Sequence, residues 1–203
     1  MTRIILARHG ITRHNFEGRV QGSLQTTLMA KGVRQAKLLA KRLAGERIDA
    51  AYCSSLTRAV QTAQEVLKYH KSLKLCRLRE LNERSFGIVE GLTFAEIAKY
   101  PGILSEQTGR VDHRYAPEKG ESWQQVKTRA MRAVKKILSA HGGETVFVAA
   151  HGGTNRMILA GLTGLPIQKA FVFRQHNACI NIIDVRENGI VRVEAINDTG
   201  HLR

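Results

Sequence analysis

The sequence Arg3-Ile4-Ile5-Leu6-Ala7-Arg8-His9-Gly10 is a short apolar run that stops at an arginine, a histidine and a glycine. Residues 4–7 have the length and composition of a buried strand, and Gly10 allows a sharp turn after it. Arg8 and His9 are therefore expected at the carboxyl end of a strand, where open α/β sheets usually bind ligands. A guanidinium matches phosphate oxygens and a neutral imidazole can attack phosphorus. The pair is equally compatible with an ordinary surface position, because a tripeptide has little specificity.

The rest of the chain alternates between segments typical of strands and of helices. The expected strands cover residues 48–53, 73–78 and 145–150, followed by a closing hairpin of 179–185 and 190–195. The expected helices cover residues 31–44 and 154–162, a segment from the cap Ser54-Ser55 to about residue 68, a short piece near 94–99, and a long segment from the capping box at Ser122 to Gly142. This alternation predicts an α/β fold, a three-layer sandwich with a mostly parallel central sheet flanked by helices.

The length of 203 residues suits a single domain over 1–203 with one hydrophobic core. Residues 90–121, which are rich in helix breakers, are expected to form an irregular insertion that caps the edge of the sheet. The amino terminus lacks a signal-peptide pattern, and no apolar run approaches the roughly 20 residues that span a bilayer, so we expect a cytoplasmic protein. The three cysteines lack metal-site spacing and are expected to be reduced and buried.

The chain carries 32 lysines and arginines against 17 acidic residues, a formal net charge of +15. Such a charge attracts polyanions and phosphorylated small molecules alike. Many cations alternate with apolar residues at helical spacing over 31–43 and 126–138, which indicates solvated helix faces, and basic-aromatic repeats that would stack bases are absent. A phosphorylated small molecule is therefore the favoured partner, nucleic acid and membrane are disfavoured, and the oligomeric state stays open, with a homodimer among the options.

Three expected strand-to-helix junctions bring basic side chains to one edge of the sheet. They carry Arg8 with His9, then Arg58, then His151, and Glu83 leaves a neighbouring strand. Two arginines and two histidines around one volume suit a dianionic phosphoryl group. The histidines could instead ligate a metal ion, but the arginines at the same place would repel a cation, so no metal site is expected.

Several further motifs occur along the chain in a fixed order. They are Arg8-His9-Gly10-Ile11-Thr12-Arg13-His14-Asn15, Gln21-Gly22, the segment from Ser54 to Ala63 around Arg58, the segment Leu81-Asn82-Glu83-Arg84-Ser85-Phe86-Gly87-Ile88-Val89-Glu90-Gly91, Gly120-Glu121-Ser122 and His151-Gly152-Gly153. In order and spacing they resemble the histidine phosphatase superfamily, the phosphoglycerate mutase-like group. Linked motifs of this kind are far more specific than any one of them alone.

The resemblance implies that His9 is a nucleophile that becomes transiently phosphorylated, and that Glu83 protonates the leaving oxygen and then activates water. It implies that the substrate is bound by Arg8, Arg58, His151, Asn15, Gln21, Gly22 and Gly152. No cofactor is expected, because phosphoryl transfer needs mainly positioning and charge stabilisation, which fixed cations supply. His9 must be neutral to attack whereas His151 serves better as a donor, so their pKa values are expected to lie apart.

The function that this resemblance implies is a metal-independent phosphatase that hydrolyses small phosphate monoesters through a phosphohistidine. A phosphoglycerate mutase-type transfer is the alternative, disfavoured because the family's mutases have longer insertions and a longer carboxyl-terminal tail. A basic polyanion-binding module on an inactive fold is the alternative from another class, and the intact catalytic set argues against it. Phe86 and Trp123 are expected to serve packing, and Arg84, Lys119 and Glu121 are candidates for specificity near the mouth.

Overall fold

The computed structural model describes residues 1–97, 99–100 and 112–203. Its strands are β1 (Thr2–Arg8), β2 (Ala50–Ser54), β3 (Leu75–Leu78), β4 (Thr145–Ala150), β5 (Ile180–Val185) and β6 (Val191–Asp198). They form a six-stranded sheet in the order β3-β2-β4-β1-β5-β6. The pairs from β3 to β1 are parallel, whereas β5 runs antiparallel to both of its neighbours. The sheet is therefore mostly parallel, as the sequence predicts.

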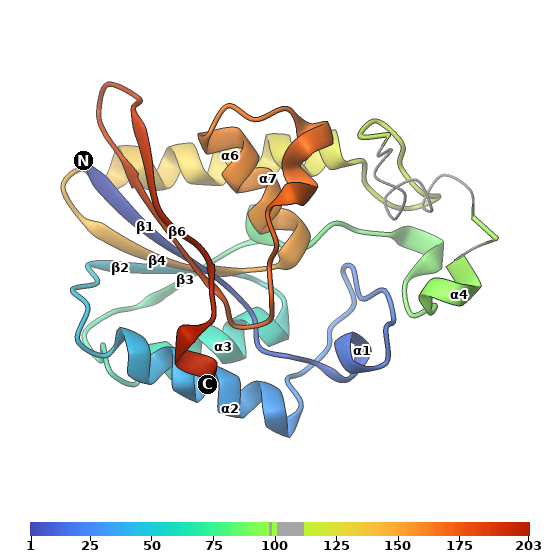
Figure 1. The fold of residues 1–203 in the computed structure, drawn as a ribbon, viewed down its shortest axis with the longest axis horizontal. Helices are drawn as coiled ribbons and strands as arrows, with labels where there is room; N and C mark the ends of the chain where they lie inside the picture. Colours follow the sequence, from blue (N-terminus) through green and yellow to red (C-terminus); the bar gives the residue numbers. More distant parts are fainter. Residues whose placement is uncertain (98, 101–111) are drawn as a thin grey trace.

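Two pairs of helices cover the two faces of this sheet (Figure 1). One face carries α6 (Trp123–Ala140) and α7 (Gly152–Leu162), and the other carries α2 (Ala30–Leu43) and α3 (Thr57–Leu67). Two short helices, α1 (Arg13–Phe16) and α4 (Phe94–Ile97), lie to the right of the sheet in Figure 1. Short 3₁₀ segments occupy Arg79–Leu81, Gly87–Val89, Ile167–Val172 and Gly200–Leu202. This arrangement confirms the predicted three-layer α/β sandwich.

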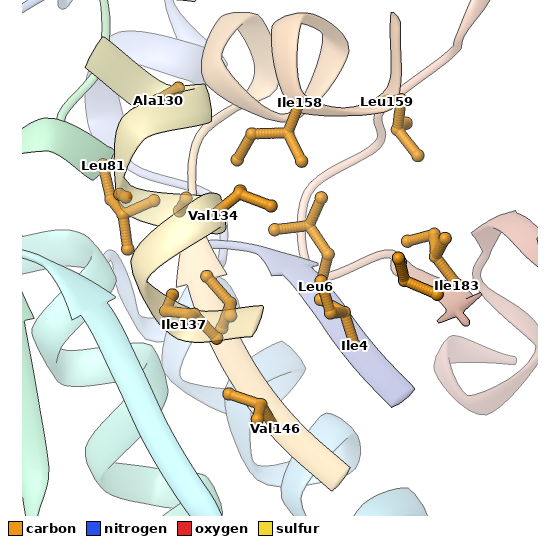
Figure 2. Packing of buried hydrophobic residues seen from close by; sticks show 14 residues of the cluster. Ile4, Leu6, Leu81, Ala130, Val134, Ile137, Val146, Ile158, Leu159 and Ile183 are labelled. Carbon is orange, nitrogen blue, oxygen red and sulfur yellow. The ribbon is translucent and has the colours of Figure 1, made fainter. Parts of the chain in front are cut away.

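The apolar run of β1 is buried on both sides, because successive side chains of a strand point to opposite faces. Ile4 and Leu6 pack into the core under α6 and α7, where Figure 2 shows them among side chains of both helices. Ile5 and Ala7 pack into the core under α2 and α3. Each large side chain buried in this way contributes about 1.5–3 kcal/mol. β1 is thus packed on both faces, which fixes the backbone position from which the side chain of Arg8 extends.

The helix starts agree with the sequence at α6 and differ at α3 and α7. At α6 the predicted capping box forms, with Ser122 and Gln125 each accepting the backbone N–H of the other. The predicted cap Ser54-Ser55 of α3 is wrong, because the N-cap is Leu56 and the N–H of Thr57 is instead accepted by the side chain of Gln25. Helix α7 begins at Gly152, two residues before the predicted start, and His151 is its N-cap.

The prediction that all three cysteines are buried is wrong for one of them. Cys53 and Cys179 are buried, but Cys76 is exposed, because β3 is an edge strand of the sheet. Within the predicted insertion over 90–121, the expected short helix corresponds to α4, while residues 98 and 101–111 lie outside the described residues. No helix among the described residues has the length and hydrophobicity needed to cross a membrane.

Candidate active site

The carboxyl ends of the parallel strands deliver the predicted side chains to one place. Arg8 and His9 come at the end of β1, Arg58 lies in the first turn of α3 after β2, and His151 caps α7 after β4. A cavity of about 220 Å³ opens there. The predicted residues that line it are Arg8, His9, Asn15, Gln21, Gly22, Arg58, Glu83 and Gly152. His151 is not among the lining residues; it is fully buried, with its ring centre 5.1 Å from that of His9.

His9 is oriented by its own backbone. Its ring nitrogen Nδ1 lies 2.7 Å from the carbonyl oxygen of Gly10, and since a carbonyl can only accept, Nδ1 carries the proton and Nε2 carries the lone pair. The side chain is only 2% exposed. Burial, and then the charges of Arg58 and Arg8, lower the pKa of His9 well below its usual 6.5. His9 therefore presents a neutral Nε2, the form that a nucleophile needs.

Gly10 is required by the close approach of helix α2. A Cβ atom added to Gly10 would lie 2.4 Å from the carbonyl oxygen of Gly32, and one added to Gly32 would lie 2.1 Å from that of Ile11. Both contacts are with backbone, which cannot swing away as a flexible side chain can. The two glycines therefore let the first turn of α2 pack directly against the chain that follows His9.

The two arginines are anchored by carbonyl oxygens. Arg58 is fully buried and donates through Nη1 to Leu24 O (2.8 Å) and through Nη2 to Gly22 O (2.7 Å). Arg8 donates through Nη1 to Gln175 O. Their buried Nε atoms have no hydrogen-bond partner among the described residues. Burial lowers the pKa of both, to about 10 for Arg58, which leaves both guanidinium groups charged at neutral pH and able to bind an anion.

The pKa of His151 is shifted in the same direction as that of His9. Burial, followed by the charges of Arg58, His9 and Arg8, lowers the pKa of His151 well below 6.5 as well. Both rings are enclosed by the same walls and face the same two arginines, so the pKa of each is lowered for the same reason. Its Nε2 lies 2.7 Å from the hydroxyl of Ser54, and its Nδ1 is buried without a hydrogen-bond partner among the described residues.

Glu83 sits against the N-terminus of α7. Its Oε2 accepts the N–H of Gly153 (2.9 Å) and its Oε1 accepts that of Thr154 (3.1 Å), two backbone groups that a helix leaves without an internal partner. A Cβ on Gly153 would lie 2.6 Å from Glu83 Oε1 and 2.5 Å from the ring of Trp123. Gly153 is therefore the residue type that lets the carboxyl group and the indole meet at this point of the cavity wall.

Arg129 of α6 holds the loop that carries Glu83. Its guanidinium pairs with both carboxyl oxygens of Glu121, at 2.8 and 2.9 Å. It also donates to three backbone carbonyls of the loop, those of Glu80 (2.8 Å), Asn82 (2.6 Å) and Glu83 (3.0 Å). Such a multidentate contact fixes position as well as adding stability. Sequence reasoning missed Arg129 and treated it as part of a solvated helix face.

Asn15 and Gln21 point their amide groups into a shared network. Asn15 Oδ1 accepts from Asn177 Nδ2 (3.1 Å) and from the N–H of Thr12 (3.3 Å). Gln21 Oε1 accepts from the hydroxyls of Thr12 (2.9 Å) and Thr26 (2.7 Å). Because both oxygens are engaged, the amide nitrogens are the donors that these side chains offer to an anion. Asn177 also donates to His9 O (3.2 Å), and no sequence motif pointed to it.

Other residues of the lining were not expected from the sequence. They are Arg19, Val20, Phe86, Trp123, Gly153, Arg156 and Phe171. Arg156 did have a usable signal, because it follows Gly152 by four residues in α7 and so shares its helix face. Its guanidinium lies over the ring of Phe171, 5.6 Å from the ring centre. Phe171 itself comes from a distant 3₁₀ segment and had no local signal.

The aromatic wall combines packing with a place in the site. Phe86 and Trp123 pack together in a hydrophobic cluster, as the sequence predicts, and they also line the cavity. The guanidinium of Arg84 is buried between them, 4.7 Å from the ring centre of Phe86 and 4.6 Å from that of Trp123. Arg84 thus stiffens this wall from behind. Among the described residues, neither Lys119 nor Glu121 lines the cavity.

The alternative of a metal centre gains no support from the described part of the chain. It contains no group of three or more His, Cys, Asp or Glu side chains arranged to hold a metal ion. The cavity is instead lined by cationic and aromatic side chains, with Glu83 as the carboxylate at its wall. This set suits an anionic ligand with a small organic part.

Comparisons with known proteins point the same way. The family model of the histidine phosphatase superfamily (branch 1) matches residues 4–199. The metal-independent phosphoserine phosphatase of Arabidopsis thaliana is 34% identical, covering 100% of this chain and 84% of its own length. Among solved structures, Bacillus stearothermophilus YhfR superposes with a TM-score of 0.91 at 31% identity, and a mutant phosphoserine phosphatase from Entamoeba histolytica in complex with phosphoserine with 0.87 at 26%. Both cover 100% of this chain and of their own.

Proposed function

Because this chain belongs to branch 1 of the histidine phosphatase superfamily and is a phosphatase, we propose that it hydrolyses small phosphate monoesters through a phosphohistidine formed on His9, without a metal ion. The observation that carries the proposal is the convergence of a neutral, oriented imidazole with two charged arginines at one cavity. Positioning and electrostatic stabilisation are the main demands of phosphoryl transfer, and this set of groups meets both.

In the first step, Nε2 of His9 attacks the phosphorus atom and the bond from phosphorus to the leaving oxygen breaks. Arg8 and Arg58 stabilise the charge on the non-bridging oxygens, and Asn15 donates to the same group from its amide nitrogen. Glu83, at the wall of the cavity, gives a proton to the departing oxygen so that an alcohol leaves. The products of this step are the alcohol and a phosphohistidine.

In the second step, a water molecule attacks the phosphorus atom on the side that the alcohol has left. Glu83, now ionised, takes a proton from that water, and the bond between phosphorus and Nε2 breaks. Inorganic phosphate leaves, His9 returns to its neutral form, and the proton that Glu83 took from the water replaces the one it gave to the alcohol. Because Nδ1 of His9 keeps its proton and donates it to the Gly10 carbonyl oxygen throughout, the ring keeps one orientation in both steps.

For the substrate class we propose a small phosphorylated acid, with phosphoserine as the first candidate. The cavity of about 220 Å³ is smaller than the roughly 300–1,000 Å³ of pockets for drug-sized ligands. Arg156 lines it together with Phe171, so a carboxylate on the organic part of the substrate would meet a guanidinium. The Arabidopsis relative and the Entamoeba structure are phosphoserine phosphatases, which supports the same class.

The proposal is tested by turnover of phosphoserine, 3-phosphoglycerate and p-nitrophenyl phosphate in the presence of EDTA. We expect hydrolysis by the native chain and its loss in His9→Ala, with His14→Ala as a control, because His14 is a histidine of the same segment that does not line the cavity. Rapid quenching in alkaline detergent with ³²P-labelled substrate should trap a base-stable, acid-labile phosphoenzyme only in chains that keep His9. Hydrolysis that survives in His9→Ala would exclude this nucleophile.

The same assay separates the alternatives. A mutase would return the phosphoryl group to another hydroxyl of the acid, so isomerised ester rather than inorganic phosphate would accumulate. A polyanion-binding module would show no turnover and would bind RNA with an affinity that falls steeply with added salt. The formal charge of +15 makes that control worth running at moderate salt.

A further inference from the structure

Ser54, at the end of β2, connects the second histidine of the site to the loop that carries Glu83. It is fully buried. Its hydroxyl oxygen lies 2.7 Å from Nε2 of His151 and 2.8 Å from Oδ1 of Asn82, and it accepts the N–H of Leu56 at 3.1 Å. A hydroxyl has one proton to donate and two lone pairs with which to accept. These limits determine which partner donates in each of the three hydrogen bonds.

Asn82 decides where the hydroxyl proton goes. Its Oδ1 also accepts the backbone N–H and the hydroxyl of Ser55, both at 2.9 Å. A backbone N–H is always a donor, so the side-chain atom of Asn82 at this position is the oxygen and not the nitrogen. The hydroxyl of Ser54 therefore donates its proton in a hydrogen bond to Oδ1 of Asn82. Toward His151 it can only accept, and Nε2 of His151 must be the donor.

We propose that Ser54, held by Asn82, is a positioning residue that keeps the proton of neutral His151 on Nε2, so that every change in the charge of this ring takes place at Nδ1. That nitrogen is buried and has no hydrogen-bond partner among the described residues. The charged groups that act on the ring are Arg58, Arg8 and Arg129, together with the titratable His9.

The role depends on the phosphatase reaction proposed above. When a dianionic phosphoryl group binds beside Arg8 and Arg58, its charge favours a second proton on His151. Since Nε2 is already occupied, this proton is taken up from solvent at Nδ1, which then donates to a phosphoryl oxygen. Ser54 keeps its own hydrogen atom throughout and makes no contact with the substrate. In the opposite tautomer Nε2 would face the Ser54 hydroxyl as a second acceptor, and the ring would lose its anchor.

The experiment determines the tautomer of His151 by two-bond ¹H–¹⁵N correlation NMR on the full chain labelled with ¹⁵N-histidine. The signals of His151 are those missing from His151→Asn. In the native chain near neutral pH we expect a protonated nitrogen at Nε2 and an unprotonated one at Nδ1. Ser54→Ala should shift the ring toward a mixture of tautomers and lower kcat/KM for p-nitrophenyl phosphate about tenfold, the effect of losing one hydrogen bond in the reacting state.

Ser55→Ala is the matched control, because it removes a hydroxyl that also donates to Asn82 but does not contact His151. It should leave the tautomer as it is in the native chain. If Ser54 only supported the fold, Ser54→Ala would lower the stability and leave the proton on Nε2. A native His151 with its proton on Nδ1 overturns the inference outright, whether or not Ser54→Ala folds. The NMR measurement needs no turnover. Hydrolysis that survives in His9→Ala would therefore contradict the proposed reaction but would leave the assignment of this tautomer unaffected.

Discussion

Mild acid should destabilise this protein through the two histidines of the site. Both rings are buried and the pKa of each lies well below 6.5. An unfolded chain binds a proton at each histidine near pH 6.5, whereas the folded chain does not, so below that pH the unfolded state holds more protons. Stability then rises with pH and is lost as the pH falls. The loss approaches about 1.4 kcal/mol per histidine per pH unit.

The two rings together should therefore cost about 3 kcal/mol of unfolding free energy between pH 7.5 and about pH 5.5. That is a large share of the roughly 5–15 kcal/mol of a typical domain. The pKa values of the carboxylates Asp184 and Glu121 are lowered, by Arg3 for the first and mainly by Arg129 for the second. Their contribution is lost only as the pH falls below the usual carboxylate range, so it does not overlap this window.

Urea unfolding followed by circular dichroism at several pH values measures this loss in phosphate-free buffer. His9→Asn and His151→Asn should each reduce the loss by about 1.4 kcal/mol, and the double variant should nearly abolish it. The half-buried His201, whose pKa burial also lowers, adds to the slope of every variant and cancels in the differences. Arg132→Gln, a change at an exposed site, should keep the native slope. A double variant that unfolds with the native pH dependence would refute the reasoning.

Three other substitutions test separate parts of the site. Arg129→Met should lower the unfolding free energy by about 3 kcal/mol, because the loop of Glu83 loses its anchor. For the same reason it should lower kcat more than tenfold with little change in KM. Equal effects on kcat and KM would contradict this. Gly10→Ala should cost about 3 kcal/mol in urea unfolding, since its Cβ would collide with Gly32 O at 2.4 Å. Arg156→Gln should raise KM for phosphoserine about tenfold and leave that for p-nitrophenyl phosphate unchanged, as steady-state kinetics would show.

The strands and the phosphoryl-binding end of the site could be predicted because their signals are local. The run before Arg8 is apolar, short and ends in a glycine, and the same pattern recurs before His151. Both place their polar residue at a strand end, whatever the rest of the chain does. The cap of α3 could not be predicted in this way. Its N–H group at Thr57 is accepted by the side chain of Gln25, which belongs to a loop more than thirty residues earlier in the chain.

The residues that sequence reasoning missed act across the fold. Phe171 and Asn177 reach the site from segments far along the chain from His9, and Arg129 faces the loop of Glu83 rather than solvent. Nothing in their immediate neighbours distinguishes them from ordinary packing or surface residues. The pKa of His151 was also beyond the sequence, since it depends on how completely the fold removes the ring from water.

Anion binding and nucleophile activation depend on the same charges. Arg8 and Arg58 stay protonated although burial lowers their pKa, and Glu83 is the carboxylate that counters this effect for both. Burial is the largest cause of the lowered pKa of His9, and two fixed positive charges beside the ring lower it further, so the arginines that would hold a phosphoryl group also help to keep His9 neutral. Replacing either arginine by a neutral residue therefore weakens the hold on the substrate and raises the pKa of the nucleophile together. In a site built in this way, the charge that attracts the substrate adds to burial in keeping the imidazole neutral and reactive.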